Sequence, residues 1–244
     1  MSDDAGMHEA RRTIAFANER GTSLAEPFVG VFPVSGAAVS VLSVQMGQAT
    51  VASTDATATR LDELQFDLGE GPCWQALESR APVVEANLRT ARETIWPHFL
   101  DALRSDRLGR DVGAMYAFPL MIGTLEIGAV DLWSANPGEL NPRAISDATS
   151  LADLTAWQVL RRVIGSIPQL TTETDSISSR REIHQATGMV LVQLGISADD
   201  AALLLRAHAF ATGRSLSAVA SDVVGRRLDF SDGHSPGNTT TGRE

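Results

Sequence analysis

A polar stretch at residues 166–177 (SIPQLTTETDSI) divides the chain into two parts with different hydrophobic patterns. Its Pro168 has no amide hydrogen and would interrupt a helix. Upstream, apolar residues occur in short alternating runs, which are typical of strands, whereas downstream they recur every three to four residues, as in amphipathic helices. We therefore predict a domain at 1–165, a linker at 166–177, a second domain at 178–228 and a disordered tail at 229–244.

The first part has the pattern of an α+β domain. Runs rich in Val and Ser at 37–45 and 49–53 predict one hairpin, and residues 113–121 with 125–134 predict a second. Helices are expected before, between and after these strands, at 7–20, 57–65, 72–79, 97–105 and 141–165. Strands in the middle with helices at both ends indicate a mostly antiparallel sheet flanked by helices.

The second part is predicted to be entirely helical. Residues 178–194 carry an apolar stripe that ends at Gly195. Ser197 and Asp200 have the spacing of a capping box for a second helix, and Ser215 would cap a third. Three short helices of this kind bury their apolar faces only against one another, so they are expected to form one small bundle.

Charge is distributed unevenly over these parts. The chain carries 20 Arg, no Lys and 30 acidic residues, which gives a formal net charge of −10. Residues 1–175 hold 13 Arg against 23 acidic residues, but residues 176–228 hold 6 Arg against 4. The helical part is thus the only net-basic stretch, and guanidinium groups are well suited to phosphates and bases.

Several classes of protein are disfavoured by the sequence. No apolar run approaches the roughly 20 residues that cross a bilayer, and the start, MSDDAGMHEARR, is acidic where a secretory signal would be basic. A single cysteine, Cys73, forms no internal disulfide. We therefore expect a cytoplasmic protein without a membrane partner. No metal-ligand spacing, catalytic triad or glycine-rich phosphate loop is present, so we expect no catalytic residue, metal or cofactor.

Two segments resemble known families. Residues 179–224 (SRREIHQATGMVLVQLGISADDAALLLRAHAFATGRSLSAVASDVV) resemble an ANTAR domain, the RNA-binding antitermination module of bacterial regulators. Upstream, GEGPCWQALESRAPVVEANL and the hairpin ending GAVDLWS resemble a GAF domain, of the kind fused to ANTAR domains in actinobacteria. The resemblance implies a dimeric, non-enzymatic transcription antitermination regulator that binds RNA hairpins in nascent mRNA under the control of a GAF sensor.

The resemblance also suggests which residues contact RNA. They are basic or polar and are expected on exposed positions of the three helices, where they would hold the RNA backbone or read unstacked loop bases. The amides at the start of the third helix favour phosphate. The candidate RNA-binding residues are Arg180, Arg181, His184, Gln185, Arg206, Arg214, Ser215 and Ser217.

Alternatives remain at several positions. Arg180 and Arg181 could form a solvated helix face, and Arg206 could pair with Asp200. Cys73 would lie near a helix N-terminus, which lowers a thiol pKa, but a buried structural cysteine is favoured because no His or Asp accompanies it in the sequence.

At the level of the whole protein, the rivals are a DNA-binding transcription factor with a helix-turn-helix output and an enzyme that uses Cys73. The cyclic-nucleotide and chromophore motifs of GAF domains are absent from the sequence. The GAF-like domain could therefore take an unknown small ligand or a partner protein, or serve only to dimerise the chain. A wide apolar stripe on 141–165 favours a homodimer.

Overall fold

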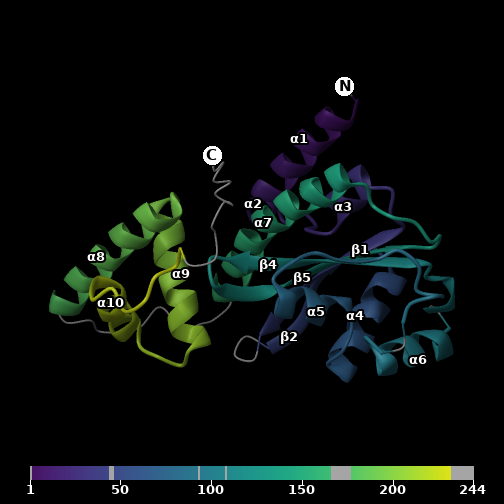
Figure 1. The fold of residues 1–244 in the computed structure, drawn as a ribbon. Helices are drawn as coiled ribbons and strands as arrows, with labels where there is room; N and C mark the ends of the chain where they lie inside the picture. The colour runs from purple at the N-terminus through teal and green to yellow at the C-terminus, as the bar shows by residue number, and fades with distance from the viewer. Residues whose placement is uncertain (1, 44–46, 93, 108, 166–176, 232–244) are drawn as a thin grey trace, which may run out of the picture. The chain divides into compact units, whose positions relative to one another are not determined.

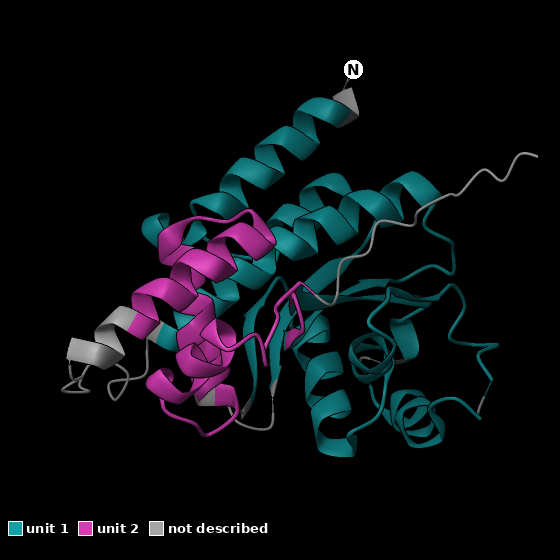
Figure 2. Cartoon of the chain, turned by 60° about the vertical axis from the view of Figure 1, so that its left-hand side comes forward, with its two compact units in different colours: residues 1–121, 126–165 teal, residues 122–125, 166–244 magenta. Residues whose placement is uncertain are grey.

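The computed structural model describes residues 2–43, 47–92, 94–107, 109–165 and 177–231 (Figure 1). It separates into two compact units (Figure 2), which are Met1–Met121 with Glu126–Gly165, and Ile122–Leu125 with Ser166–Glu244. We call them the N-terminal and the C-terminal unit. The predicted linker, except for its last residue, and the tail beyond residue 231 lie outside the described residues.

The N-terminal part is built on a five-stranded antiparallel sheet, in the order β2-β1-β5-β4-β3. Both predicted hairpins are present. Their strands are β1 (Gly36–Ser43), β2 (Gly47–Ser53), β4 (Ala114–Ile122) and β5 (Leu125–Ser134), and β3 (Val83–Glu85) is added at one edge. The two hairpins are joined side by side through β1 and β5, where Val41 lies opposite Gly128. The predicted α+β class is confirmed.

Helices cover both faces of the sheet (Figure 1). On one face lie α1 (Ser2–Ala15), α2 (Ala17–Arg20), α3 (Glu26–Val31) and α7 (Pro142–Gly165). On the other lie α4 (Ala56–Leu68), α5 (Pro72–Ser79) and α6 (Pro97–Ser105), followed by a 3-10 turn at Gly109–Asp111. Asn141 caps α7, since its Oδ1 accepts a hydrogen bond of 2.9 Å from the Ala144 amide. The six-residue α3 was not predicted from the sequence.

The main core on the α4 side is a layer of apolar side chains between the sheet and helices α4 to α6. Phe99 and Leu100 of α6 and Met115 of β4 are almost fully buried there, and Trp96 packs edge-on against Phe99. A smaller cluster holds Cys73. Burial of these side chains fixes α4 and α5 against β1 and β5, and this arrangement determines the surroundings of every polar group beneath the two helices.

The C-terminal unit contains α8 (Ile177–Leu194), α9 (Ala198–Ala211) and α10 (Leu216–Val224), and each of them packs against the other two. Their shared core includes Val190, Leu205 and Val219. The predicted helix boundaries are observed: Gly195 and Gly213 have left-handed φ angles of 64° and 62°. The Ser197 hydroxyl accepts a hydrogen bond from the Asp200 amide at 3.1 Å and donates one to its carboxylate at 2.8 Å.

The predicted tail begins too early. The described chain continues to Ser231, and Phe230 is fully buried in the C-terminal unit. Its ring lies edge-on to His208 at a centroid distance of 5.3 Å, and its amide approaches Gln193 Oε1 at 3.4 Å. A single apolar residue in a polar segment gave no periodic signal, so the sequence alone did not indicate that it would be ordered.

Candidate nucleic-acid interface

The exposed flank of α8 is where the sequence predicts it. His184 and Gln185 face solvent, while Ala186 and Val190 are buried on the opposite side of the helix. Arg180 and Arg181 belong to the first turns of α8, but their side chains lie outside the described residues. The helical spacing that separates apolar from polar residues therefore presents two of the four predicted α8 positions to solvent.

On α9, Arg206 is exposed next to the buried Leu204 and Leu205. Of the charged residues that the structure describes, none forms an ion pair with it, and the pairing with Asp200 considered from the sequence is not observed. The Arg206 guanidinium is thus directed at solvent and has its hydrogen-bond donors available for an anionic partner.

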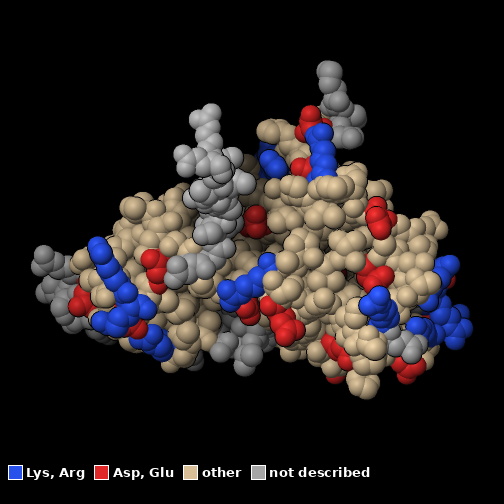
Figure 3. All heavy atoms as spheres, viewed as in Figure 1, with Lys and Arg blue, Asp and Glu red and all other residues tan. Residues whose placement is uncertain are grey.

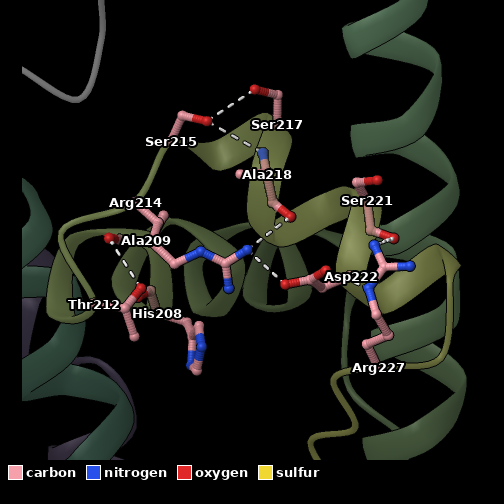
Figure 4. A network of polar contacts seen from close by, with 10 residues as sticks. All are labelled: His208, Ala209, Thr212, Arg214, Ser215, Ser217, Ala218, Ser221, Asp222 and Arg227. Carbon is pink, nitrogen blue, oxygen red and sulfur yellow. Dashed lines mark hydrogen bonds and ion pairs between the residues drawn. The ribbon is translucent and has the colours of Figure 1, made fainter.

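Arg214 has a different environment, because it shares an acidic partner with a second arginine (Figure 4). Its guanidinium contacts Asp222 Oδ2 at 2.5 Å, and the Arg227 guanidinium contacts Asp222 Oδ1 at 2.7 Å. Hydrogen bonds from Arg214 and then from Arg227 hold the pKa of Asp222 below its usual range. One carboxylate on α10 therefore fixes two guanidinium groups and neutralises only part of their charge.

The two predicted serines lie at the start of α10. Ser215 is the N-cap: its hydroxyl accepts a hydrogen bond of 3.2 Å from the Ala218 amide and lies 3.0 Å from the Ser217 hydroxyl. Arg214 directly precedes the cap, but its guanidinium points to the Ala218 carbonyl and Asp222, whereas Ser215 and Ser217 lie together (Figure 4). The positive end of the helix at these two serines favours an anion.

His208 belongs to the core rather than to this surface. It is half-buried against the Phe230 ring. Burial, and then the nearby charge of Arg214, lowers its pKa. The imidazole is therefore neutral at neutral pH, as suits a side chain packed against an aromatic ring.

A groove of about 520 Å³ runs along α8 and the segment after α10, and sequence reasoning did not find it. Its apolar lining includes Val192, of which 78% is exposed. The polar lining residues are Gln185, Gln193, Arg226 and Asp229. Only Gln185 was predicted as a site residue. The others could not be predicted, because nothing in the local pattern shows that the chain turns back toward α8 after α10.

Cys73 is buried at the start of α5, where its amide donates a hydrogen bond of 2.9 Å to Gln65 Oε1. Burial raises the pKa of its thiol, and the charges of Asp131 and Asp62 raise it further. A thiol in this state is a poor nucleophile. The geometry thus opposes the reading of Cys73 as a catalytic thiolate.

Among the described residues, no group of three or more His, Cys, Asp or Glu side chains is arranged to hold a metal ion. No single helix in the described ranges is long and apolar enough to cross a membrane. Glu182–Leu194 and Ala198–Ala209 reach the required length and composition only as a pair, and they are bent by 107° at the break between them.

Comparison with known families agrees with both resemblances. The sequence model of the GAF domain matches residues 20–160, which is more than half of the chain. The chain belongs to the GAF domain family. The model of the ANTAR domain matches residues 174–224, so the C-terminal unit carries an ANTAR domain. GAF domains are sensor modules and ANTAR domains are RNA-binding antitermination modules, which gives the chain the architecture of a GAF–ANTAR regulator.

Solved GAF domains also resemble the chain at low sequence identity. The GAF domain of a phosphoenolpyruvate-protein phosphotransferase from Coxiella burnetii is 14% identical, with a TM-score of 0.47, and the match covers 67% of this chain and 98% of that one. The corresponding Acinetobacter domain is 12% identical, with a TM-score of 0.48, and the match covers 66% and 98%. No curated protein sequence matches the chain significantly.

Proposed function

We propose that the chain is a non-enzymatic transcription antitermination regulator of the actinobacterial GAF–ANTAR type. Its ANTAR domain binds RNA hairpins in nascent mRNA, and its GAF domain controls that binding. One observation carries the proposal: the ANTAR match coincides with the only net-basic segment, and the described arginines of that segment are all exposed. They are Arg206, Arg214, Arg226 and Arg227. Figure 3 shows basic side chains gathered on the surface of the C-terminal unit.

These residues suit an RNA loop better than a DNA groove. Guanidinium groups of arginine bind phosphates, and amide side chains such as Gln185 can hydrogen-bond to base edges. The bases of an RNA loop are accessible to such side chains because they are unstacked. A helix-turn-helix protein instead needs a helix with a polar, base-reading face. Helix α10 turns Val219, Ala220 and Val223 into the core, which leaves little of it to read a groove.

The GAF–ANTAR regulator is proposed to act as a homodimer, because two-hairpin targets suit a protein with two-fold symmetry. Helix α7 supports this proposal, since Leu154 and Trp157 on its apolar stripe are only partly buried. The GAF domain would then contribute the contact between copies, in addition to any small ligand or partner protein that it binds.

The proposed function is tested by replacing Arg180 and Arg181 with alanine in the full chain. Loss of two phosphate contacts is expected to weaken hairpin binding about tenfold or more and to make its salt dependence shallower. Gel shifts with RNA hairpins and with duplex DNA at several salt concentrations measure both. Light scattering of the same samples is expected to show a dimer rather than a 26.0 kDa species.

The matched control replaces Arg11 and Arg12 of α1, an arginine pair in the other unit, and should bind RNA like the parent protein. Unchanged affinity in a folded Arg180→Ala, Arg181→Ala variant would remove these residues from the site. Preferential binding to duplex DNA would instead establish the helix-turn-helix alternative.

Asp222→Asn is expected to strengthen RNA binding several-fold. The substitution frees the Arg214 and Arg227 guanidinium groups from their shared carboxylate and adds one unit of positive charge to the surface. The salt slope should steepen by about one unit, as for one additional phosphate contact. Asp229→Asn makes the same charge change but releases no arginine, since Asp229 hydrogen-bonds to Ser231. Equal effects of the two variants would place Arg214 and Arg227 outside the RNA contact.

A further inference from the structure

Two acidic side chains of the GAF domain face each other in its interior. Asp62 on α4 is 1% exposed and Asp131 on β5 is 6% exposed, and the two carboxyl groups lie close enough for each to shift the pKa of the other. Among the described residues, no donor reaches Oδ1 of either acid. Because a carboxylate has no hydrogen to donate, the two acids can satisfy each other only when one of them is protonated.

The remaining oxygens of the pair are held by neutral donors. Asp62 Oδ2 accepts hydrogen bonds from the hydroxyl groups of Ser40 on β1 and Thr50 on β2, the latter at 2.9 Å. Asp131 Oδ2 accepts a hydrogen bond of 2.5 Å from Gln65 Nε2. Gln65 in turn accepts from the amide at the start of α5. One chain of hydrogen bonds thus ties α4 and α5 to β1, β2 and β5.

No described cation compensates this pair. The elements around it contribute further acidic or weakly acidic groups, which are Glu63 on α4 itself and the Cys73 thiol on α5. The ionisable residues of α6 face solvent, and they are His98, Asp101 and Arg104. Strands β1 and β2 carry no ionisable side chain in their described parts, and on β5 the exposed Glu126 pairs with Arg80 at 3.1 Å. Tyr116 of β4 donates its hydroxyl hydrogen to the Gly138 carbonyl.

Burial without a cation disfavours charge on both acids. It raises the pKa of Asp62 to about 6, against the opposing effect of the Ser40 and Thr50 hydroxyls. Burial, and then the charge of Asp62, raises the pKa of Asp131 well above its usual range. Two like charges in contact in a protein interior are strongly unfavourable. The pair therefore holds a proton that an exposed aspartate would have lost near pH 4.

We propose that the Asp62–Asp131 pair makes the GAF domain a proton-responsive input. With the pair protonated, the hydrogen-bond network closes and holds α4 and α5 on the sheet. As its protons leave, negative charge builds up on the two carboxyl groups beneath these helices, and the helices loosen. The signal is thus the proton itself. This inference does not depend on RNA binding by the ANTAR domain.

The sign of the effect follows from proton linkage. The folded pKa values lie above the unfolded value of about 4, so the folded state binds more protons than the unfolded state above that pH. The stability contributed by the pair is complete below about pH 4. It is lost as the pH rises through about 6 for Asp62 and beyond for Asp131.

The test is unfolding of the full chain in urea between about pH 5 and 8, followed by tryptophan fluorescence. All four tryptophans lie in the N-terminal unit, so the signal reports that unit: Trp74, Trp96, Trp133 and Trp157. The unfolding equilibrium constant is expected to rise by up to about tenfold per pH unit for each proton released. Asp131→Asn keeps a donor toward Asp62 and removes the second charge. This variant should be more stable than the parent at pH 8, and its stability should depend less on pH, because only one acid of the pair still titrates.

Asp101→Asn is the control, because it removes an exposed acid of α6 and should follow the parent curve. Asp62→Asn provides a second isosteric variant with the same expectation as Asp131→Asn. A second readout is the labelling rate of the single, buried Cys73 by a thiol reagent. The rate in the parent, divided by that in Asp131→Asn at the same pH, should increase from pH 5 to 8.

Three results would overturn the proposal. The first is a parent protein whose stability does not change over this range, and the second is an Asp131→Asn variant with the parent's pH dependence. The third is stability that increases with pH and is lost on chelation, which would mean that the two carboxylates hold a divalent cation rather than a proton.

Discussion

Replacing Gly128 with alanine is expected to destabilise the GAF domain severely. A Cβ at this position would lie 1.8 Å from the Ser40 carbonyl oxygen and 3.0 Å from Val41 Cα, both in the backbone of the neighbouring strand. Backbone atoms cannot turn aside as a side chain can, so β1 and β5 would have to separate. Their contact joins the two hairpins, and the loss of stability should be on the order of 4 kcal/mol or more.

Urea unfolding followed by tryptophan fluorescence measures this loss. Gly30→Ala is the matched control, because Gly30 lies in α3 and a Cβ there meets no atom within 4 Å. Alanine in a helix should stabilise the domain by up to about 1 kcal/mol. A Gly128→Ala protein as stable as the parent would show that the pairing of β1 with β5 is wrong.

Local signals for the start and the buried face of a helix explain which parts of the fold could be predicted. The helices at 72–79 and 97–105 coincide with α5 and α6 because a proline at the first position and a buried apolar face define each of them. The pairing of β1 with β5 could not be predicted, since alternation within a strand gives no information on which other hairpin it joins. The role of Gly128 depends on that pairing, so it could not be predicted either.

The site could be predicted where it depends on one helix and not where it depends on two. The exposed flank of α8 follows from helical spacing, but the sharing of Asp222 by Arg214 and Arg227 depends on how α10 and the segments around it pack. The sequence does contain one sign of the buried acids. Asp131 interrupts the apolar run GAVDLW of a strand, and an ionisable residue at such a position needs a partner.

The second large effect is expected from Gln65→Leu, which should destabilise the GAF domain by about 3 to 5 kcal/mol. The Gln65 side chain is fully buried; its Nε2 donates to Asp131 and its Oε1 accepts from the Cys73 amide. Leucine fills similar space but leaves both partners without a hydrogen bond, and each buried unpaired group costs about 1 to 3 kcal/mol. Gly71 packs so closely that a Cβ there would lie 2.6 Å from Gln65, so the side chain has no room to swing away.

The cost of Gln65→Leu should also depend on pH, which distinguishes the network from simple packing. The hydrogen bond from Gln65 lowers the pKa of Asp131, so its loss raises that pKa further. Deprotonation of Asp131 in the folded variant then costs more free energy than in the parent. The loss of unfolding free energy relative to the parent should therefore be larger at pH 8 than at pH 5. Gln48→Leu on β2, where the side chain is exposed, should change stability by no more than about 0.5 kcal/mol at either pH. A deficit for Gln65→Leu that is equal at both pH values would mean that Gln65 acts by packing alone and does not support the carboxyl pair.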